Sequence, residues 1–97
     1  MAQEKRFENK IKKYLDDNEI WYVKYFANGY TKKGVPDILA CVNGRFFGIE
    51  VKAEKGRASP IQLYNIEKIK ESGGVALVVR PSEFEKLKEI IKKELDN

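Results

Sequence analysis

VPDILACVNGRFFGIEVK, residues 35 to 52, predicts a β-hairpin that determines the rest of the fold. Its turn is Asn43-Gly44, the dipeptide best suited to a two-residue type I′ loop, because both central residues need a positive φ. A two-residue loop pairs Val42 with Arg45, and this pair fixes the register of the whole hairpin.

The register places two carboxylates opposite each other. Counting outward from the turn, Asp37 lies directly across from Glu50, so both side chains leave the same face. Lys52 follows Glu50 by two residues and therefore shares that face. Like charges directly opposite each other destabilise a sheet, and a bound divalent cation reverses that effect. An ordinary solvated strand face, or a purely structural ion pair, is the alternative for this charged trio (Asp37, Glu50 and Lys52).

The pattern of the whole chain predicts one α/β domain over residues 1–97. Helical spacing of apolar residues supports a first helix, and a run of β-branched and aromatic residues supports the strand after it. The expected elements are helix 3–17, strand 20–26, hairpin strands 37–42 and 45–53, helix 60–72, strand 75–79 and a last helix from residue 82. This order, αβββαβ plus a C-terminal helix, predicts a mixed four-stranded sheet whose fourth strand is parallel to the third.

Capping residues mark two of the helices. Ser59 can cap helix 60–72, which Gly73-Gly74 would end, and Ser82 with Glu85 predicts a capping box for the last helix. Apart from the charged trio, both faces of the hairpin are largely apolar, so we expect helices on both faces of the sheet.

The composition narrows the chemistry. The chain has no histidine, which excludes a Ser-His-Asp triad, a Cys-His pair and a zinc site with histidine ligands. Carboxylate ligands prefer hard cations such as Mg²⁺, Mn²⁺ or Ca²⁺. The single cysteine, Cys41, lies in a predicted strand and is expected to pack in the core. With no possible internal disulfide, no apolar run of membrane length and no signal-peptide core, we expect a cytoplasmic protein without membrane contact.

The positive charge is concentrated around the hairpin. Residues 21–60 hold seven basic and three acidic side chains, which accounts for the whole net charge of +4. Two loops that flank the charged trio, residues 27–36 and 54–58, carry most of this excess, and nucleic acid is the polyanion that it suits. A solubilising surface is the alternative. The candidate DNA contacts are Tyr30, Lys32, Lys33, Gly34, Lys55 and Arg57.

Two further polar residues are candidates for the site. Glu8 adjoins the apolar stripe of the first helix and should lean toward the core, although an edge ion pair with Lys12 at i+4 explains it equally well. Gln62 shares a helical face with Ile66 and points toward the sheet, while its spacing from Ser59 is also that of a capping box. These two roles of Gln62 do not exclude each other.

Together these motifs resemble the PD-(D/E)xK nuclease superfamily, whose core is restriction-endonuclease-like, and within it the stand-alone VRR-NUC type. The resemblance covers roughly residues 4 to 80. It rests on GVPD at residues 34–37, IEVK at 49–52 and SPIQ at 59–62, together with Glu8. The chain departs from the pattern in one respect, since no fourth acid lies near Lys52 in sequence except Glu54.

The resemblance implies a metal-dependent DNA endonuclease that hydrolyses phosphodiester bonds. Asp37, Glu50 and the backbone carbonyl of Val51 would hold Mg²⁺ or Mn²⁺, with Glu8 assisting directly or through water. Lys52 would orient the attacking water or stabilise charge on the phosphate, and Gln62 would position the water or a carboxylate ligand.

The compact relatives are similar to homodimeric Holliday junction resolvases of DNA repair and recombination. We therefore expect a homodimer that recognises the shape of branched DNA through backbone contacts. The aromatic side chains are expected in the core or at a dimer surface: Phe7, Tyr14, Trp21, Phe46 and Phe47. The alternatives are a flap or nicking nuclease that acts beside a helicase, and a non-catalytic DNA- or RNA-binding module.

Overall fold

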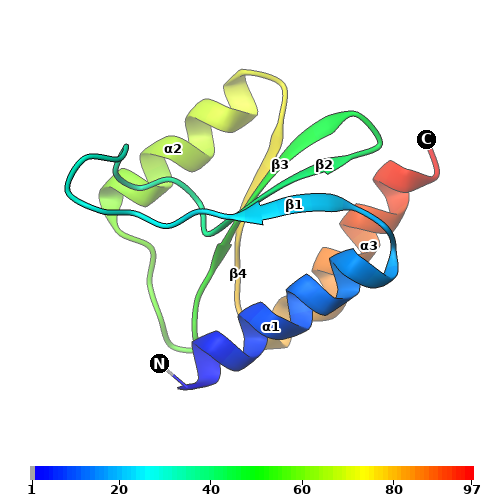
Figure 1. Cartoon of the computed structure of the whole chain (residues 1–97), viewed down its shortest axis with the longest axis horizontal. Coiled ribbons are helices and arrows are strands. Elements are labelled where there is room, and N and C mark those ends of the chain that lie inside the picture. Colours follow the sequence, from blue (N-terminus) through cyan, green and yellow to red (C-terminus); the bar gives the residue numbers. More distant parts are fainter. Residues whose placement is uncertain (1) are drawn as a thin grey trace.

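The computed structural model describes residues 2–97 as a four-stranded sheet with helices on its two faces (Figure 1). The strands lie in the order β1-β2-β3-β4, with β1, β2 and β3 antiparallel and β4 parallel to β3. This is the predicted mixed sheet. In chain order the elements are α1 (Ala2–Asp17), β1 (Trp21–Lys24), β2 (Ile38–Val42), β3 (Arg45–Val51), α2 (Pro60–Glu71), β4 (Val75–Val79), the 3₁₀ helix η1 (Pro81–Glu83) and α3 (Phe84–Leu95).

The hairpin has the predicted turn and register. Asn43 and Gly44 both have positive φ, 50° and 83°, as a type I′ turn requires. Val42 pairs with Arg45 at the turn, and the ladder runs without a slip to Ile38 opposite Ile49. The next residue outward on each strand brings Asp37 to the level of Glu50.

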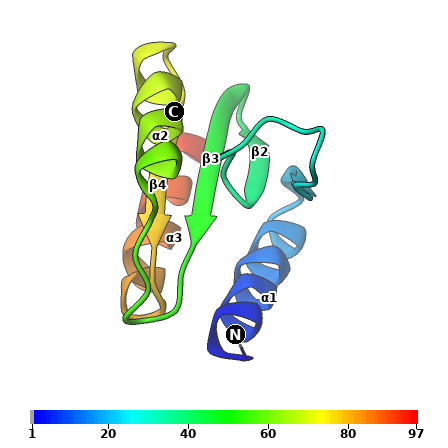
Figure 2. The same cartoon turned by 90° about the vertical axis from the view of Figure 1, so that its left-hand side faces the viewer.

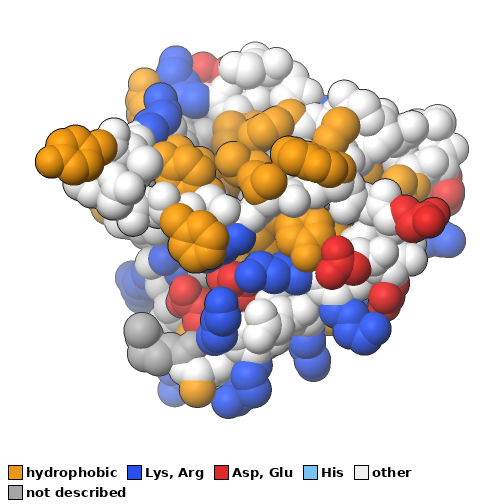
Figure 3. Space-filling model, in the orientation of Figure 1, with side chains coloured by type: hydrophobic (Ala, Val, Ile, Leu, Met, Phe, Trp, Pro, Cys, Tyr) orange, Lys and Arg blue, Asp and Glu red, His pale blue; other side chains and the backbone are white. Residues whose placement is uncertain are grey.

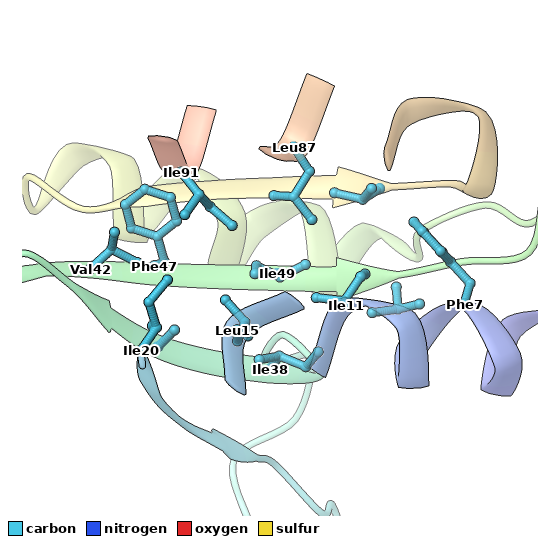
Figure 4. Close-up of a cluster of buried hydrophobic side chains, with 13 residues drawn as sticks. Phe7, Ile11, Leu15, Ile20, Ile38, Val42, Phe47, Ile49, Leu87 and Ile91 are labelled. Atoms are coloured by element: carbon cyan, nitrogen blue, oxygen red, sulfur yellow. The ribbon is translucent and has the colours of Figure 1, made fainter. Parts of the chain in front are cut away.

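A single apolar layer joins the sheet to α1 and α3. Both helices lie on one face of the sheet, whereas α2 lies on the other (Figures 1 and 2). The inward side chains of β3 alternate along the strand, and Phe47, Ile49 and Val51 are fully buried against Ile11 and Leu87 of the two helices (Figure 4). Burying a side chain of this size stabilises the fold by about 1.5–3 kcal/mol. This layer holds the hairpin rigidly in position.

The second face of the sheet is covered only in part. Helix α2 packs against β3 and β4, which leaves the same face of β1 and β2 open. The prediction that Cys41 packs in the core is therefore wrong, because its side chain is exposed on this open face. The expectation that helices lie on both faces of the sheet is confirmed for β3 and β4 and is wrong for β1 and β2. Phe7 and Phe47 are in the core as expected, whereas Trp21 is 68% and Phe46 46% exposed.

Two element boundaries differ from the prediction. Strand β1 is shorter than 20–26 because its ladder with β2 ends at the pair Lys24–Ile38. The predicted capping box of Ser82 with Glu85 is wrong. Ser82 lies inside η1, and its N–H and hydroxyl donate to the carboxylate of Glu54 at 2.9 and 2.6 Å. This contact takes the N–H of Ser82 that would donate to Glu85, and the Ser82 hydroxyl donates to Glu54 instead of serving as the acceptor that caps a helix.

The other predicted cap is confirmed. Ser59 accepts a hydrogen bond from the N–H of Gln62, and the side chain of Gln62 accepts one from the N–H of Ser59. Gly73, with φ of 100°, ends the helix. Over residues 2–97, no helix combines the length and the apolar character that a membrane crossing requires.

Replacing Gly44 tests the turn. Gly44→Ala meets no neighbouring atom, but its φ of 83° is unfavourable for any residue with a Cβ. We expect a loss of about 1–2 kcal/mol in the free energy of unfolding, measured by urea denaturation. Gly29→Ala, also in open space and without a positive φ, is the matched control and should change stability by less than about 0.5 kcal/mol. Equal effects of the two variants would contradict the type I′ turn.

Candidate metal and nuclease site

The charged trio lies at the end of the sheet where β2 begins and β3 ends. Asp37 comes directly before β2, and its Oδ2 accepts a hydrogen bond of 2.8 Å from the N–H of Val51. The side chain of Asp37 thus takes the place of the next backbone hydrogen bond between β2 and β3. Glu50 is 1% exposed, and its Oε2 lies 3.4 Å from Nζ of Lys52. The predicted constellation is therefore present as three neighbouring side chains.

Glu50 is buried without full compensation. Burial and the adjacent carboxylate of Asp37 raise the pKa of Glu50 from 4.5 to about 8, although Lys52 acts in the opposite direction. Within residues 2–97, its buried Oε1 has no hydrogen-bond donor. Buried oxygens without a partner are costly, and a second carboxylate beside one adds repulsion. A divalent cation between Asp37 and Glu50 would remove both penalties.

The oxygen donors fit a hard divalent cation. In the described part of the chain, no three acidic or cysteine side chains gather into a metal-binding group. Two carboxylates, Asp37 and Glu50, are present at the site, so the remaining ligands must be backbone carbonyls or waters. Mg²⁺ typically keeps several waters and takes one or two carboxylates, and Asp37 and Glu50 provide two carboxylates.

Glu8 is linked to the site through a lysine. Lys24, at the end of β1, places Nζ 2.9 Å from Oε1 of Glu8 and 3.4 Å from Oδ1 of Asp37. The other oxygen of Glu8 lies 2.9 Å from Nζ of Lys12, so the ion pair at i+4 exists alongside the inward orientation. Burial opposes ionisation of Glu8, but the bonds from Lys12 and Lys24 outweigh it and lower its pKa from 4.5 to about 2.

Gln62 lies in the first turn of α2, the helix on the face of the sheet to which Glu50 points. Its Oε1 is occupied by the N–H of Ser59 at 2.8 Å, as the capping alternative predicts. This bond leaves the Nε2 amide as the group that can act as a donor outside the helix. The cap fixes the side chain of Gln62 at the first turn of α2 rather than leaving it free.

The first basic loop is anchored to α2. Asn65, 6% exposed, donates to the carbonyls of Lys33 and Ile61 at 2.9 and 3.1 Å. Gly34 has φ of 76°, and a Cβ there would lie 2.7 Å from the carbonyl oxygen of Ile61, so the position needs glycine for close packing. At the tip of the loop, Tyr30 is fully exposed.

The second basic loop is anchored to the end of β4. Arg80 donates two hydrogen bonds, of 3.0 and 2.8 Å, to the carbonyl of Gly56. Together with Glu54, Lys55 and Arg57, these residues line an open notch of about 400 Å³. Figure 1 shows both basic loops on the left of the molecule, where α2 begins. The candidate DNA contacts of the two loops therefore lie on one side.

Three residues at or near the site were not identified from the sequence. Lys24 is one lysine in an aromatic strand, Arg80 is an isolated arginine after a buried strand, and Asn65 interrupts an apolar helical stripe. The stripe could have marked Asn65 as a buried polar residue in need of partners. Lys24 could have been found only by extending the register to β1, where Lys24 pairs with Ile38.

Comparison with known proteins identifies one family. The family model described as archaeal Holliday junction resolvase (Hjc) matches residues 2–85, which include the charged trio, Glu8, Gln62 and both basic loops. No curated protein matches the chain.

The buried carboxylate predicts an unusual dependence of stability on pH. Between about pH 4.5 and pH 8 the folded chain retains a proton on Glu50 that the unfolded chain has lost. The free energy of unfolding without metal should therefore fall as pH rises through this window, by up to about 1.4 kcal/mol per pH unit. Glu50→Gln should remove that contribution. Urea denaturation in EDTA measures it, and equal slopes for the two proteins would contradict the assignment.

Proposed function

The chain belongs to the archaeal Holliday junction resolvase family, a group of structure-selective nucleases within the PD-(D/E)xK superfamily, and from this premise we propose a metal-dependent DNA endonuclease. Its reaction is the hydrolysis of phosphodiester bonds in branched DNA during repair or recombination. The observation that supports it most strongly is the unpartnered buried oxygen of Glu50 beside Asp37.

Mg²⁺ or Mn²⁺ is the proposed cofactor, held by Asp37, Glu50 and the backbone carbonyl of Val51. When bound, the ion supplies Lewis-acid chemistry that favours hydroxide over water and offsets charge on the scissile phosphate. Asp37 is oriented for this role by the N–H of Val51, which holds its Oδ2. Glu8 assists from one step further away, because Lys24 connects its carboxylate to that of Asp37.

Lys52 and Gln62 are the proposed polar groups around the reacting phosphate. Lys52 is anchored to Glu50 and retains 16% exposure, so its ammonium can orient the attacking water or stabilise charge on the phosphate. Gln62 offers its Nε2 amide to the water or to a phosphate oxygen, since its Oε1 is held in the helix cap. Both side chains are positioned before substrate arrives.

The two basic loops are the proposed DNA contacts. Lysine and arginine side chains neutralise phosphates without reading the sequence, which suits recognition by shape. Gly34 supports this surface by letting the first loop approach α2 closely rather than by a charge of its own. The proposed contact residues remain Tyr30, Lys32, Lys33, Gly34, Lys55 and Arg57.

We propose a homodimer that forms through the open face of the sheet. The register places Trp21, Cys41 and Phe46 side by side across β1, β2 and β3. Figure 3 shows hydrophobic side chains gathered across the middle of the view, over the region of these strands, with charged groups below them. Trp21 is 68% and Phe46 46% exposed, so both rings still have apolar surface to bury, and two copies of this row contribute to the roughly 1,200–2,000 Å² that a stable interface needs. A second copy also supplies the second site that symmetric cleavage requires.

Other assignments remain as proposals of lower rank. The resemblance to the stand-alone VRR-NUC type is one of them. Another is a flap or nicking nuclease that acts beside a helicase. A binding module without catalysis would leave the buried pair of carboxylates unexplained. A cytoplasmic location follows from the proposed substrate.

Cleavage of a synthetic four-way junction tests the proposed reaction. We expect cleavage by the wild type with Mg²⁺ or Mn²⁺ and none in EDTA. Asp37→Asn should reduce the rate by roughly 10³-fold or more, because several kcal/mol of metal-dependent stabilisation is lost. Junction binding in EDTA should remain, which separates a nuclease from a binding module. Lys93→Ala, on the exposed end of α3, is the control. Wild-type protein that leaves junctions, flaps and splayed duplexes intact would contradict the proposal.

Sedimentation velocity tests the dimer. We expect the wild type to sediment as a dimer at micromolar concentration and Phe46→Glu as a monomer, because a carboxylate cannot be buried at the centre of an apolar interface without a partner. Lys93→Glu changes charge by the same sign on α3 and should leave the dimer intact. A wild-type protein that cuts junctions but remains a monomer would refute the proposed interface.

A further inference from the structure

A groove open to solvent lies between α1 and α3. It consists of two adjoining hollows of about 200 and 220 Å³, and Lys10 and Phe84 line both of them. The other lining residues are Gln3, Arg6, Phe7 and Pro81 in the first hollow, and Lys13, Tyr14, Asp17 and Lys88 in the second. We call this surface the α1–α3 groove.

The floor of the groove is aromatic. The ring of Phe84 makes edge contacts with the rings of Phe7 and Tyr14, with centroid distances of 5.7 and 6.3 Å. Phe7 is buried, whereas Phe84 and Tyr14 are only half-buried. The fold therefore leaves apolar surface exposed in the groove, on side chains that their neighbours hold in place.

The rim of the groove is basic. Arg6, Lys10 and Lys13 recur at i, i+4 and i+7, which places them on one side of α1, and Lys88 of α3 lies across the groove from them. Against these four cations, Asp17 is the single acidic residue among those that line the two hollows. The rim is therefore complementary to a negatively charged ligand.

Two of the four cations have no acidic partner of their own. Lys13 pairs with Asp17 at 3.1 Å, and Lys88 pairs with Glu85 at 2.9 Å. No ion pair within residues 2–97 involves Arg6 or Lys10, and both side chains are exposed. Carboxylates of a ligand can pair with these two residues without displacing an existing contact.

The groove is separate from the proposed nuclease site. Helix α1 turns Glu8 toward Lys24 and the charged trio, whereas Phe7 and Tyr14 of the same helix contact α3. No lining residue of the groove belongs to the charged trio or to the two basic loops. A ligand in the groove leaves the DNA contacts uncovered.

The combination of floor and rim favours a peptide over nucleic acid. Single-stranded bases stack on open ring faces, but Nζ of Lys88 lies 4.7 Å from the ring centroid of Phe84 and 5.9 Å from that of Tyr14. The phosphates of a duplex need charge and have no use for an apolar floor. A peptide that carries both carboxylates and apolar side chains matches both parts of the groove.

We propose that the α1–α3 groove is a docking site for an acidic amphipathic helix of another protein. Apolar side chains of that helix enter the two hollows, and its carboxylates pair with Arg6 and Lys10. Anchors at helical spacing suit the groove, because the rim from Arg6 to Lys13 extends about 10 Å, or two helical turns. The inference does not depend on the proposed nuclease activity.

Fluorescence anisotropy with synthetic peptides tests this inference. The probes are fluorescein-labelled helices of about 15 residues with glutamates on one face and two leucines on the other, spaced i, i+3, i, i+4 or i, i+7. At least one should bind the full-length chain saturably with a micromolar Kd. A peptide of the same charge with serines in place of the leucines should not bind. Amide shifts in ¹⁵N NMR spectra should map to Arg6, Lys10 and Lys88.

Charge reversal on the rim is the matched test. Lys10→Glu should weaken peptide binding roughly tenfold or more, because it places a like charge against the peptide's carboxylates. Lys10 is exposed, and circular dichroism checks that the variant is folded. Lys93→Glu makes the same change of charge elsewhere on α3 and should leave peptide binding unchanged. Cleavage of the four-way junction by Lys10→Glu should equal that of the wild type.

Four results would overturn the inference. They are no saturable binding of any leucine peptide, equal binding of the serine peptide, equal weakening by Lys93→Glu, and displacement of the peptide by junction DNA. Loss of junction affinity in Lys10→Glu as large as in Lys55→Glu would make the groove part of the DNA surface instead. Loss of a wild-type dimer in Lys10→Glu would show that a second copy of the chain covers the groove. A wild type that cuts no junction but binds the peptide would refute only the proposed function.

Discussion

Two carboxylates held side by side at a buried end of the sheet are the constraint on which the site depends. Asp37 and Glu50 face each other because the hairpin register leaves them no other position. In the metal-free chain this costs stability, since Glu50 retains a proton until its pKa near 8. The proposed cation would offset this cost.

The rest of the fold keeps this pair in place. Burial of Phe47, Ile49 and Val51 against α1 and α3 fixes β3, so Glu50 on the opposite face cannot turn away to water. On that face, α2 and the loop before β2 meet where Gly34 lies against Ile61 and Asn65. The basic loops around the site are thus attached to the same apolar core as the carboxylates.

The hairpin was predictable because its determinants are local. An Asn-Gly turn fixes the register, and the register fixes which side chains face each other, so the charged trio, β4 and the capped α2 follow from short stretches of sequence. The features that could not be predicted from the sequence depend on contacts between distant segments. Ser82 is drawn to Glu54, Cys41 is exposed because α2 stops short of β2, and Lys24 reaches Glu8 across sixteen residues. No periodicity encodes these pairs.

The protonation of Glu50 with and without Mg²⁺ is the most direct measurement of the central claim, and ¹³C NMR of its carboxyl carbon reports it. We predict a pKa near 8 in EDTA and a fall of several units in saturating Mg²⁺, because the cation replaces the proton between the two carboxylates. A Glu50 carboxyl that titrates near its ordinary value and does not respond to Mg²⁺ would contradict the account.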